Sequence, residues 1–274
     1  MNHAELRAEL QSLAAILDAG SFPELHEYLA DILNGEEGED AQSDPFEIAN
    51  DMLRCDRPAS FPKEVIDTVT LLFESAFAAG NADAMNDLGA QYYGGQRGFE
   101  QNFAKAFECY RLAAQNGSRQ AQENLGYCYY YGRHVPVDYE KAFHYFALGA
   151  LDGHLISLYK IGDMYAAGYY VQKNTAEAFR IYSRCMETMT EEASGVVAGP
   201  VYLRLGKCFL NGVGVERNAR SALLCYQKAE QFLFDMVRRG NIMYRKSLSA
   251  AIDGQTKARE ILKKELPDNK WIDE

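Results

Sequence analysis

Hydrophobic and small residues recur along the middle of this chain with a period of about 36 residues. A Leu-Gly pair stands at Leu88-Gly89 and returns, once with isoleucine in place of leucine, at Leu125-Gly126, Ile161-Gly162 and Leu205-Gly206. An aromatic ring follows each glycine by three residues, and a second glycine follows each ring by three more. Because these positions stay in phase, the pattern predicts four copies of one structural unit.

The second half of each unit repeats as well. Four alanines are each followed, four residues later, by Tyr or Phe, and they are Ala106, Ala142, Ala178 and Ala222. Residues i and i+4 share one face of a helix, so this half is predicted to be a second helix. A glycine inside a helix costs roughly 1 kcal/mol relative to alanine. The Leu-Gly glycine therefore predicts a close approach of the partner helix, with the alanine as its small counterpart.

The turn between the two halves carries the signals of a helix end and a helix start. The second glycine of each unit is placed to end the first helix, and these glycines are Gly95, Gly132, Gly168 and Gly212. Such a glycine readily takes the left-handed conformation that closes a helix. Asp138 and Asn174 are suited to cap the second helix. Each unit is therefore predicted to be a pair of α-helices.

The combined motif, A-x-x-x-L-G-x-x-Y-x-x-G-x-x-V…D/N-x-x-K-A-x-x-x-Y/F, resembles the Sel-one-like repeat, a relative of the tetratricopeptide repeat. The match covers roughly residues 84–230 and is close from Ala121 to Ala150. The resemblance implies an all-α, right-handed α-α superhelix, that is, a solenoid. It also implies an adaptor role in protein complexes, since no single chemistry belongs to the family.

The repeat boundaries divide the chain into three predicted parts, residues 1–60, 61–231 and 232–274. Residues 61–231 are predicted to form the solenoid, with a degenerate leading helix at 65–79 before the four repeats. Eight extra residues separate repeats three and four, and the stretch 187–200, which contains Gly195, Gly199 and Pro200, is predicted to be an inserted loop. Residues 232–274 are interpreted as a degenerate fifth repeat, in which Ala258 takes the place of Ala222, followed by a tail. Such a terminal repeat would cap the array.

The front end, residues 1–60, differs from the repeats. Spaced leucines predict amphipathic helices at 4–18 and 22–33, with a short helix at 46–54. Residues 1–80 contain 17 acidic and 4 basic side chains, a net charge of −13, whereas the whole chain carries −11. An acidic front end argues against binding nucleic acid, whose phosphates attract basic surfaces. The run from Gly35 to Asp40 is predicted to be an acidic loop.

The sequence predicts a cytoplasmic protein that does not insert into membranes. The first 20 residues lack the basic and apolar regions of a signal peptide. Apolar runs such as 69–73 are far too short to span a bilayer. Six cysteines occur without a C-x-x-C pair, so we expect all six to be reduced thiols.

No motif in the chain points to catalysis, a metal or a cofactor. The sequence lacks H-E-x-x-H, G-x-S-x-G, a P-loop and G-x-G-x-x-G. His144 and His154, ten residues apart, are interpreted as ordinary histidines and not as a zinc site. We therefore predict no enzymatic activity. The alternative is a hydrolase acting on cell-wall-like or antibiotic ligands, as the resemblance implies for a few members of the family, and it would require a nucleophile and a base brought together.

The resemblance to tetratricopeptide repeats also implies a partner-binding surface. Positions −6, −3, +1, +4 and +5 from the Leu-Gly glycine would face the concave groove of the solenoid and bind a peptide or protein. Among these positions we predict the partner-binding residues to be Asn86, Tyr93, Glu123, Tyr127, Tyr130, Tyr131, Tyr159, Asp163, Lys207 and Asn211. Four of the tyrosines, at 127, 130, 131 and 159, are expected to form the centre of the interface, because tyrosine is favoured there. The alternative is that these rings pack between adjacent repeats.

Overall fold

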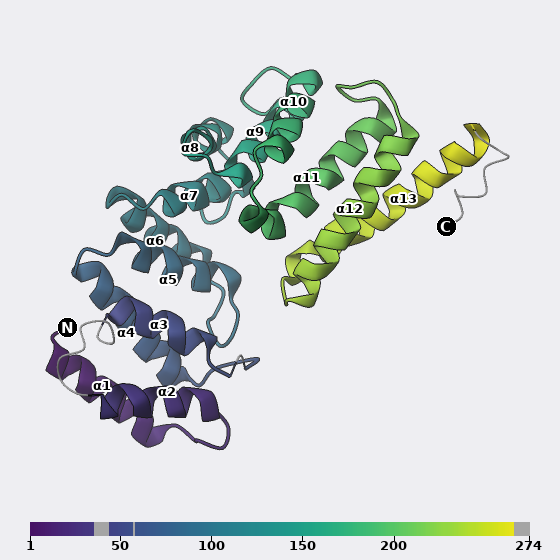
Figure 1. Cartoon of the computed structure of the whole chain (residues 1–274). Coiled ribbons are helices and arrows are strands. Elements are labelled where there is room, and N and C mark those ends of the chain that lie inside the picture. Colours follow the sequence, from purple (N-terminus) through teal and green to yellow (C-terminus); the bar gives the residue numbers. More distant parts are fainter. Residues whose placement is uncertain (36–43, 57, 266–274) are drawn as a thin grey trace. The chain divides into compact units, whose positions relative to one another are not determined.

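The computed structural model describes residues 1–35, 44–56 and 58–265, and every regular element in these ranges is helical, apart from an isolated bridge between Ser60 and Arg97 (Figure 1). The elements, in chain order, are α1 (His3–Ile16), α2 (Pro23–Asn34), α3 (Pro45–Arg54), α4 (Lys63–Ala78), α5 (Ala82–Gly94), α6 (Phe103–Gln115), α7 (Arg119–Tyr131), α8 (Tyr139–Leu151), α9 (Leu155–Ala167), α10 (Thr175–Glu187), α11 (Glu191–Asn211), α12 (Ala219–Arg238), a short 3-10 helix (Ile242–Tyr244) and α13 (Arg245–Glu265). Within the described ranges, no helix combines the length and the apolar character needed to cross a membrane. The chain divides into two compact units, residues 1–138 and residues 139–274.

In the first unit, successive helices pack in antiparallel pairs. Helix α1 packs on α2, α3 on α4 and α5 on α6, and α4 and α6 pack on the first helix of the following pair. The three front helices begin and end within two residues of the predicted positions, and α4 occupies the predicted leading helix. The predicted acidic loop lies largely outside the described residues. Leu10, Leu25, Leu29 and Phe73 are almost fully buried in the core of this unit.

In the second unit, α9 pairs with α10, α11 with α12, and α13 packs on α12. The C-cap glycines of both units have the left-handed conformation that the sequence predicts, with φ of 58° at Gly95 and 81° at Gly168. Asn174 caps α10 by accepting a hydrogen bond from the Glu177 backbone N–H at 3.0 Å. The cap residues therefore fix where each helix starts and stops.

The Leu-Gly glycines of repeats one, three and four each lie against an aromatic ring. A Cβ atom added to Gly89 would lie 2.8 Å from Tyr110 Cε1, and one added to Gly162 would lie 2.6 Å from Tyr182 Cε1. The same relation joins Gly206 to Tyr226 at 2.9 Å. The predicted close approach of the two helices is thus confirmed in repeats one, three and four. The atoms nearest to each glycine are those of the ring four residues after the repeat alanine.

The extra residues before repeat four are mostly helical, so the prediction of an inserted loop at 187–200 was wrong. Helix α11 begins at Glu191 and includes Pro200 in its interior. A Cβ atom on Gly199 would lie 2.9 Å from Leu233 Cγ, so this glycine permits α12 to approach and does not break the helix. Buried Val197 and Val201 on the same extension compensate for the hydrogen bond that proline cannot donate.

Helix α13 also differs from its predicted role. We expected Ala258 to correspond to the alanine of a second helix. Instead, α13 packs on α12 and also contacts α11. The first helix α7 has the same two contacts with the preceding repeat, since it packs on α6 and also contacts α5. Gly254 lies against the ring of Tyr226. The segment from Gly254 to Ala258 therefore matches A-x-x-x-L of a first helix, and α13 continues the array as a fifth first helix.

Candidate partner-binding surface

Three tyrosines form a cluster at the end of α7. The rings of Tyr127 and Tyr131 are stacked, with centroids 6.1 Å apart and an angle of 8° between their planes. Tyr130 meets Tyr131 edge-on at 4.8 Å. Tyr131 is 47% exposed, whereas Tyr127 and Tyr130 are half-buried. The three rings hold each other in place and offer an aromatic surface at the end of the first helix of repeat two, which we call the tyrosine cluster.

Tyr93 belongs to a second group of rings in the same unit. Its centroid lies 5.2 Å from that of Phe103 and 6.5 Å from that of Tyr110. Burial raises the pKa of the Tyr93 hydroxyl, while a hydrogen bond and the charge of Arg133 act in the opposite direction. The guanidinium of Arg133 also lies 4.7 Å from the centroid of Phe103. Tyr93 is therefore half-buried between Phe103 and Tyr110 of its own repeat and Arg133 of the next.

Two of the predicted polar residues pack inside the first unit. Asn86 is 6% exposed; its Nδ2 donates to Asp87 Oδ1 at 3.1 Å and its Oδ1 accepts from Asn124 Nδ2 at 2.9 Å. Glu123 is 3% exposed. A partner would have almost no surface of either side chain to contact. The prediction that Asn86 and Glu123 line an exposed groove is therefore wrong, because both side chains are buried and Asn86 binds Asn124 of the neighbouring first helix instead.

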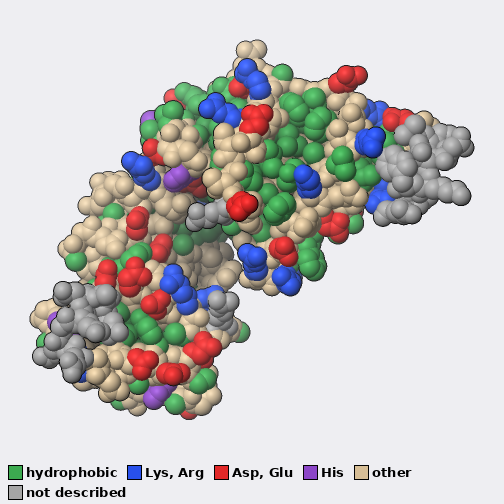
Figure 2. All heavy atoms as spheres, in the orientation of Figure 1, with side chains coloured by type: hydrophobic (Ala, Val, Ile, Leu, Met, Phe, Trp, Pro, Cys, Tyr) green, Lys and Arg blue, Asp and Glu red, His purple; other side chains and the backbone are tan. Residues whose placement is uncertain are grey.

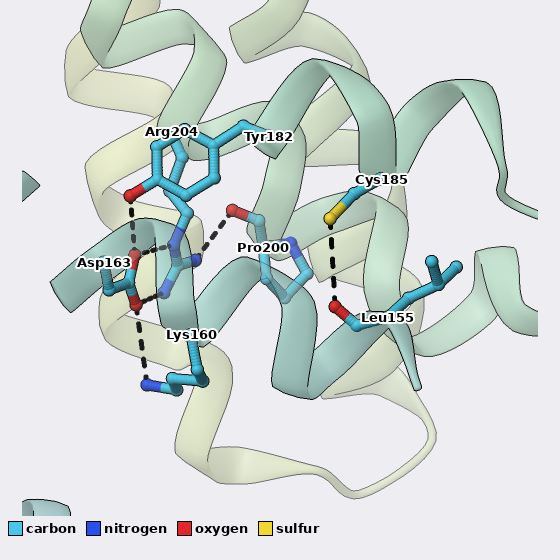
Figure 3. Close-up of polar contacts among 7 residues, drawn as sticks. All are labelled: Leu155, Lys160, Asp163, Tyr182, Cys185, Pro200 and Arg204. Carbon is cyan, nitrogen blue, oxygen red and sulfur yellow. Dashed lines mark hydrogen bonds and ion pairs between the residues drawn. The ribbon is translucent and has the colours of Figure 1, made fainter. Parts of the chain in front are cut away.

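In the second unit, Asp163 lies at the centre of a charged cluster (Figure 3). Arg204 donates from Nε and Nη2 to the two carboxylate oxygens of Asp163, at 2.5 and 2.6 Å. The hydroxyl of Tyr182 donates to Oδ1 at 2.8 Å, and Lys160 Nζ lies 3.6 Å from Oδ2. Arg204 Nη1 also donates to the carbonyl of Pro200 at 2.8 Å. Side chains of α9, α10 and α11 thus meet on one carboxylate, and such a bidentate Arg–carboxylate pair is strong and directional.

The charged cluster shifts the protonation equilibria of its members. Burial by itself would raise the pKa of Asp163, but the charge and hydrogen bonds of Arg204, with Lys160 and Tyr182, lower it below its ordinary value. Burial, together with the charge of Asp163, raises the pKa of the Tyr182 hydroxyl. Asp163 therefore stays ionised and Tyr182 stays protonated over the physiological range.

Tyr159 is part of this cluster and not of an exposed surface. It is 4% exposed, and the Arg204 guanidinium lies 4.5 Å from its ring centroid. Tyr127, Tyr130 and Tyr131 belong to the first unit and Tyr159 to the second. The expected interface centre of four exposed tyrosines is therefore wrong in its fourth member, because Arg204 and the neighbouring helices cover that ring. Arg204 was not predicted as a functional residue, because its position one residue before Leu205 carries no repeat signature.

Lys207 and Asn211, the predicted residues of repeat four, are both exposed and border two surface cavities. One cavity, of about 300 Å³, is lined by Lys207, Leu210, Asn211, Tyr226, Ala250, Asp253, Gly254 and Lys257. The other, of about 430 Å³, is lined by Leu210, Asn211, Arg217, Lys257, Glu260 and Ile261. The α13 residues were missed because α13 was aligned as a second helix; the spacing of Gly254, Ala258 and Leu262 is the signal that could have placed it.

The described part of the chain contains no group of three or more His, Cys, Asp or Glu side chains that could hold a metal ion. The thiols of the six cysteines are not joined in disulfides in the structure. Burial raises the pKa of Cys109 and Cys208 to about 11 and that of Cys128 and Cys185 to about 12. Since the thiolate is the reactive form, these four side chains are poor nucleophiles at neutral pH.

Charge is unevenly distributed over the surface. In Figure 2, acidic side chains are more prominent than basic ones around α1 to α4. This agrees with the 17 acidic and 4 basic residues among residues 1–80. Exposed hydrophobic side chains are also present, and those of the second unit include Leu224, Phe234 and Met243.

Comparison with known proteins identifies the repeats. The sequence profile of the Sel1 repeat matches residues 82–118, 119–154, 155–184 and 200–231. Protein sel-1 homolog 2 of Homo sapiens is 32% identical over 136 residues, which are 48% of this chain and 20% of that protein. The ERAD-associated E3 ubiquitin-protein ligase component HRD3B of Arabidopsis thaliana is 37% identical over 84 residues, which are 31% of this chain and 14% of that protein. The chain spans a fifth or less of the length of these two relatives.

Two solved structures share the fold. A Sel1 repeat protein from Oxalobacter formigenes is superposed with a TM-score of 0.53 over 69% of this chain and 75% of its own, at 24% identity. A protective antigen of uropathogenic Escherichia coli strains, which displays an SLR fold, gives a TM-score of 0.56 over 99% of this chain and 62% of its own, at 17% identity. At these identities the likeness concerns the fold alone, and it confirms the predicted all-α repeat solenoid.

Proposed function

Because the chain is a Sel1-repeat protein with four such repeats, we propose that it is a scaffold that binds a protein or peptide partner through its first helices, without catalysing a reaction. Repeat solenoids present extended surfaces built from equivalent positions of successive units. A partner can therefore contact several repeats at once. The repeat fold does not by itself imply a catalytic site.

The observation that carries the proposal is the tyrosine cluster on α7. Stacked and edge-on contacts restrict the rings of Tyr127, Tyr130 and Tyr131, so a partner that binds them freezes few additional rotamers. Nearly half of the surface of Tyr131 is exposed to solvent and could contact a partner. Tyrosine combines a large apolar area with a hydroxyl for hydrogen bonds, which makes it favourable at the centre of interfaces.

The relatives support a role within assemblies. The Arabidopsis relative, to which 84 residues of this chain are similar, is named as a component of a ubiquitin-protein ligase. The hydrolase alternative gains no similar support. The two cavities beside Lys207 and Asn211 are lined by neither histidine nor cysteine.

The test is affinity capture from the cells that produce the protein, comparing the parent chain with Tyr131→Ala. The matched control is Leu224→Ala, which truncates a similarly exposed apolar side chain, 55% exposed, on the second helix of repeat four. We expect Tyr131→Ala to lose a specific partner that the parent and the control retain. Far-UV circular dichroism and melting curves should show that both variants are folded.

The same proteins captured at the same yield by the parent and by Tyr131→Ala would contradict the proposal. A parent chain that captures nothing specific, or a control that loses the partner as completely as Tyr131→Ala, would contradict it as well. Tyr131→Phe separates the contributions of the ring and the hydroxyl, because it keeps the stacking on Tyr127 and removes only the polar group.

A further inference from the structure

Two neighbouring cavities lie beside the last turns of α11 and the middle of α13. Their linings share Leu210, Asn211 and Lys257, so we treat the two cavities together as one surface feature. We call it the α11–α13 groove and define it by Lys207, Leu210, Asn211, Arg217, Lys257 and Ile261. Gly254 also borders the groove, and because it carries no side chain it leaves the ring of Tyr226 within reach of the floor.

The rim of the groove carries more positive than negative charge. Lys207, Arg217 and Lys257 line it, against Asp253 and Glu260. Among the residues that the structure describes, none of the three cations has a carboxylate within ion-pair distance. Burial, with the nearby charge of Arg204, lowers the pKa of Lys207, while Asp163 partly offsets this effect. A carboxylate in the groove would therefore stabilise an ammonium group that now lacks a close counter-ion.

The groove also has hydrogen-bonding and apolar groups. Asn211 Nδ2 donates to the Lys207 carbonyl at 2.9 Å, which fixes the orientation of the amide. No donor of the described residues reaches the other end of that amide, Oδ1, so a peptide N–H could bind there. Ile261 presents partly covered aliphatic surface, and Leu210, which is 9% exposed, forms a nearly buried apolar part of the lining. The lining thus combines cations, an amide and apolar side chains.

We propose that the α11–α13 groove binds an extended acidic segment of a partner protein, with a carboxylate between Lys207 and Lys257 and an aliphatic side chain over Leu210 and Ile261. This inference deepens the proposed scaffold function and rests on it. A nucleic acid fits the groove less well, since Asp253 and Glu260 would repel a continuous row of phosphates but can flank a single carboxylate. The peptide backbone would use the amide oxygen of Asn211.

The experiment titrates the full-length, isotope-labelled chain with a short, end-blocked peptide of alternating Asp and Leu residues. Its neutral counterpart has Asn in place of every Asp. We expect saturable shifts of the amide resonances of Lys207, Asn211 and Lys257 with the acidic peptide only. Lys207→Glu and Lys257→Glu should each weaken binding by about tenfold or more, because each places a like charge against the carboxylate. Lys173→Glu, which makes the same charge change in the exposed turn before α10, should leave the affinity unchanged.

Equal affinity for the acidic and neutral peptides would overturn the assignment, as would shifts confined to other residues or no binding at about 1 mM peptide. Unchanged affinity in both Lys→Glu variants would also overturn it. Backbone spectra of the variants show whether each is folded. The result is separable from the test of the scaffold function, because Tyr131 lies in the other unit. If Tyr131→Ala loses the partner but no peptide binds the groove, only this inference is contradicted. If Tyr131→Ala captures the partner as well as the parent does, the scaffold proposal is contradicted.

Discussion

Repeats two and four place different chemistry at equivalent positions of the same helix pair. At +1, +4 and +5 from the Leu-Gly glycine, repeat two has Tyr127, Tyr130 and Tyr131. Repeat four has Lys207, Leu210 and Asn211 at these three positions. In the first case the side chains stack on one another, and in the second they border cavities. The repeat therefore conserves the backbone and the buried positions, while the exposed positions of each first helix are free to differ.

The two repeats also differ in length, and this difference shows what the fold tolerates. Helix α7 has 13 residues, whereas α11 has 21 and its partner α12 has 20. The added turns of α11 and α12 pack on each other at Gly199 and Leu233. An insertion in a helical repeat thus extends both helices when a glycine and apolar residues let them remain in contact. The Arg204–Pro200 hydrogen bond ties this extension to the charged cluster.

The largest effect is expected from Asp163→Asn, which removes the carboxylate that holds α9 to α11. The change leaves Arg204 and Lys160 without their buried counter-charge, so we expect a loss of about 3–5 kcal/mol of unfolding free energy at pH 7. Glu108→Gln is the control from repeat one, because its pair with Arg111 is exposed, and it should cost about 1 kcal/mol or less. Urea denaturation followed by circular dichroism measures both. Equal costs for the two variants would show that the buried pair does not stabilise repeat four.

The pH dependence of this effect has a definite sign. The pKa of Asp163 is lowered in the folded chain from an ordinary value of 3.8, so its contribution is fully present above that value and is lost as the pH falls through the folded pKa. The difference in unfolding free energy between the parent and Asp163→Asn should therefore shrink below pH 3.8. A difference that stays constant down to the acid-unfolding limit would contradict the proposed role of the ionised carboxylate.

The second largest effect is expected from Gly199→Ala in the extension of repeat four. The added methyl group would overlap Leu233 and approach its backbone nitrogen, at 2.9 and 3.2 Å, so α11 and α12 must separate. We expect a loss of roughly 1–3 kcal/mol of unfolding free energy. A thermal melt of unchanged midpoint would show that the two extensions do not depend on this close approach.

A smaller cost is expected from Tyr131→Ala in repeat two. The ring is 47% exposed and its removal gives up contacts that include those with Tyr127 and Tyr130, so the loss of unfolding free energy should be about 1 kcal/mol. Chemical denaturation distinguishes this outcome from that of a core residue, for which a loss of several kcal/mol is typical. A loss of that size would mean that the cluster is packing between repeats and not a surface for a partner.

The smallest effect should have the opposite sign. Gly195 lies in the same extension as Gly199, but a Cβ atom there would meet no heavy atom within 4 Å. Gly195→Ala is therefore expected to stabilise the chain by roughly 0.5–1 kcal/mol through helix propensity alone. A destabilising result in the same melting assay would contradict the helical conformation assigned to residues 191–199.

The helix pairs could be predicted from the sequence because their signals are local and repeated. Leu-Gly, the C-cap glycines and Asn174 each act within one or two turns, and the structure places them as expected. The extension of α11 could not be predicted in this way. Gly195, Gly199 and Pro200 break helices on average, and only the distant Leu233 makes Gly199 favourable there.

The surface residues were harder to predict than the fold. The position of a residue in the first helix predicts which face of the helix carries its side chain. It does not predict which side chain of a neighbouring repeat covers that face. Tyr159, at −3 from the Leu-Gly glycine, and Tyr127, at +1, were both assigned to the groove face, yet Arg204 covers the ring of Tyr159. Asn86 pairs with Asn124, one repeat along. Both outcomes depend on contacts between repeats, for which a single sequence carries no marker.

The central claim, that a partner binds the first helices, is tested most directly by photo-cross-linking at defined positions. The photoreactive residue p-benzoylphenylalanine would replace Tyr131 in one sample and Leu224 in another, both in the cells that produce the protein. We expect irradiation to give a discrete cross-linked product from position 131 and none from position 224. Cross-linking from position 224 alone, or from neither position, would contradict the assignment of the binding surface to the first helices.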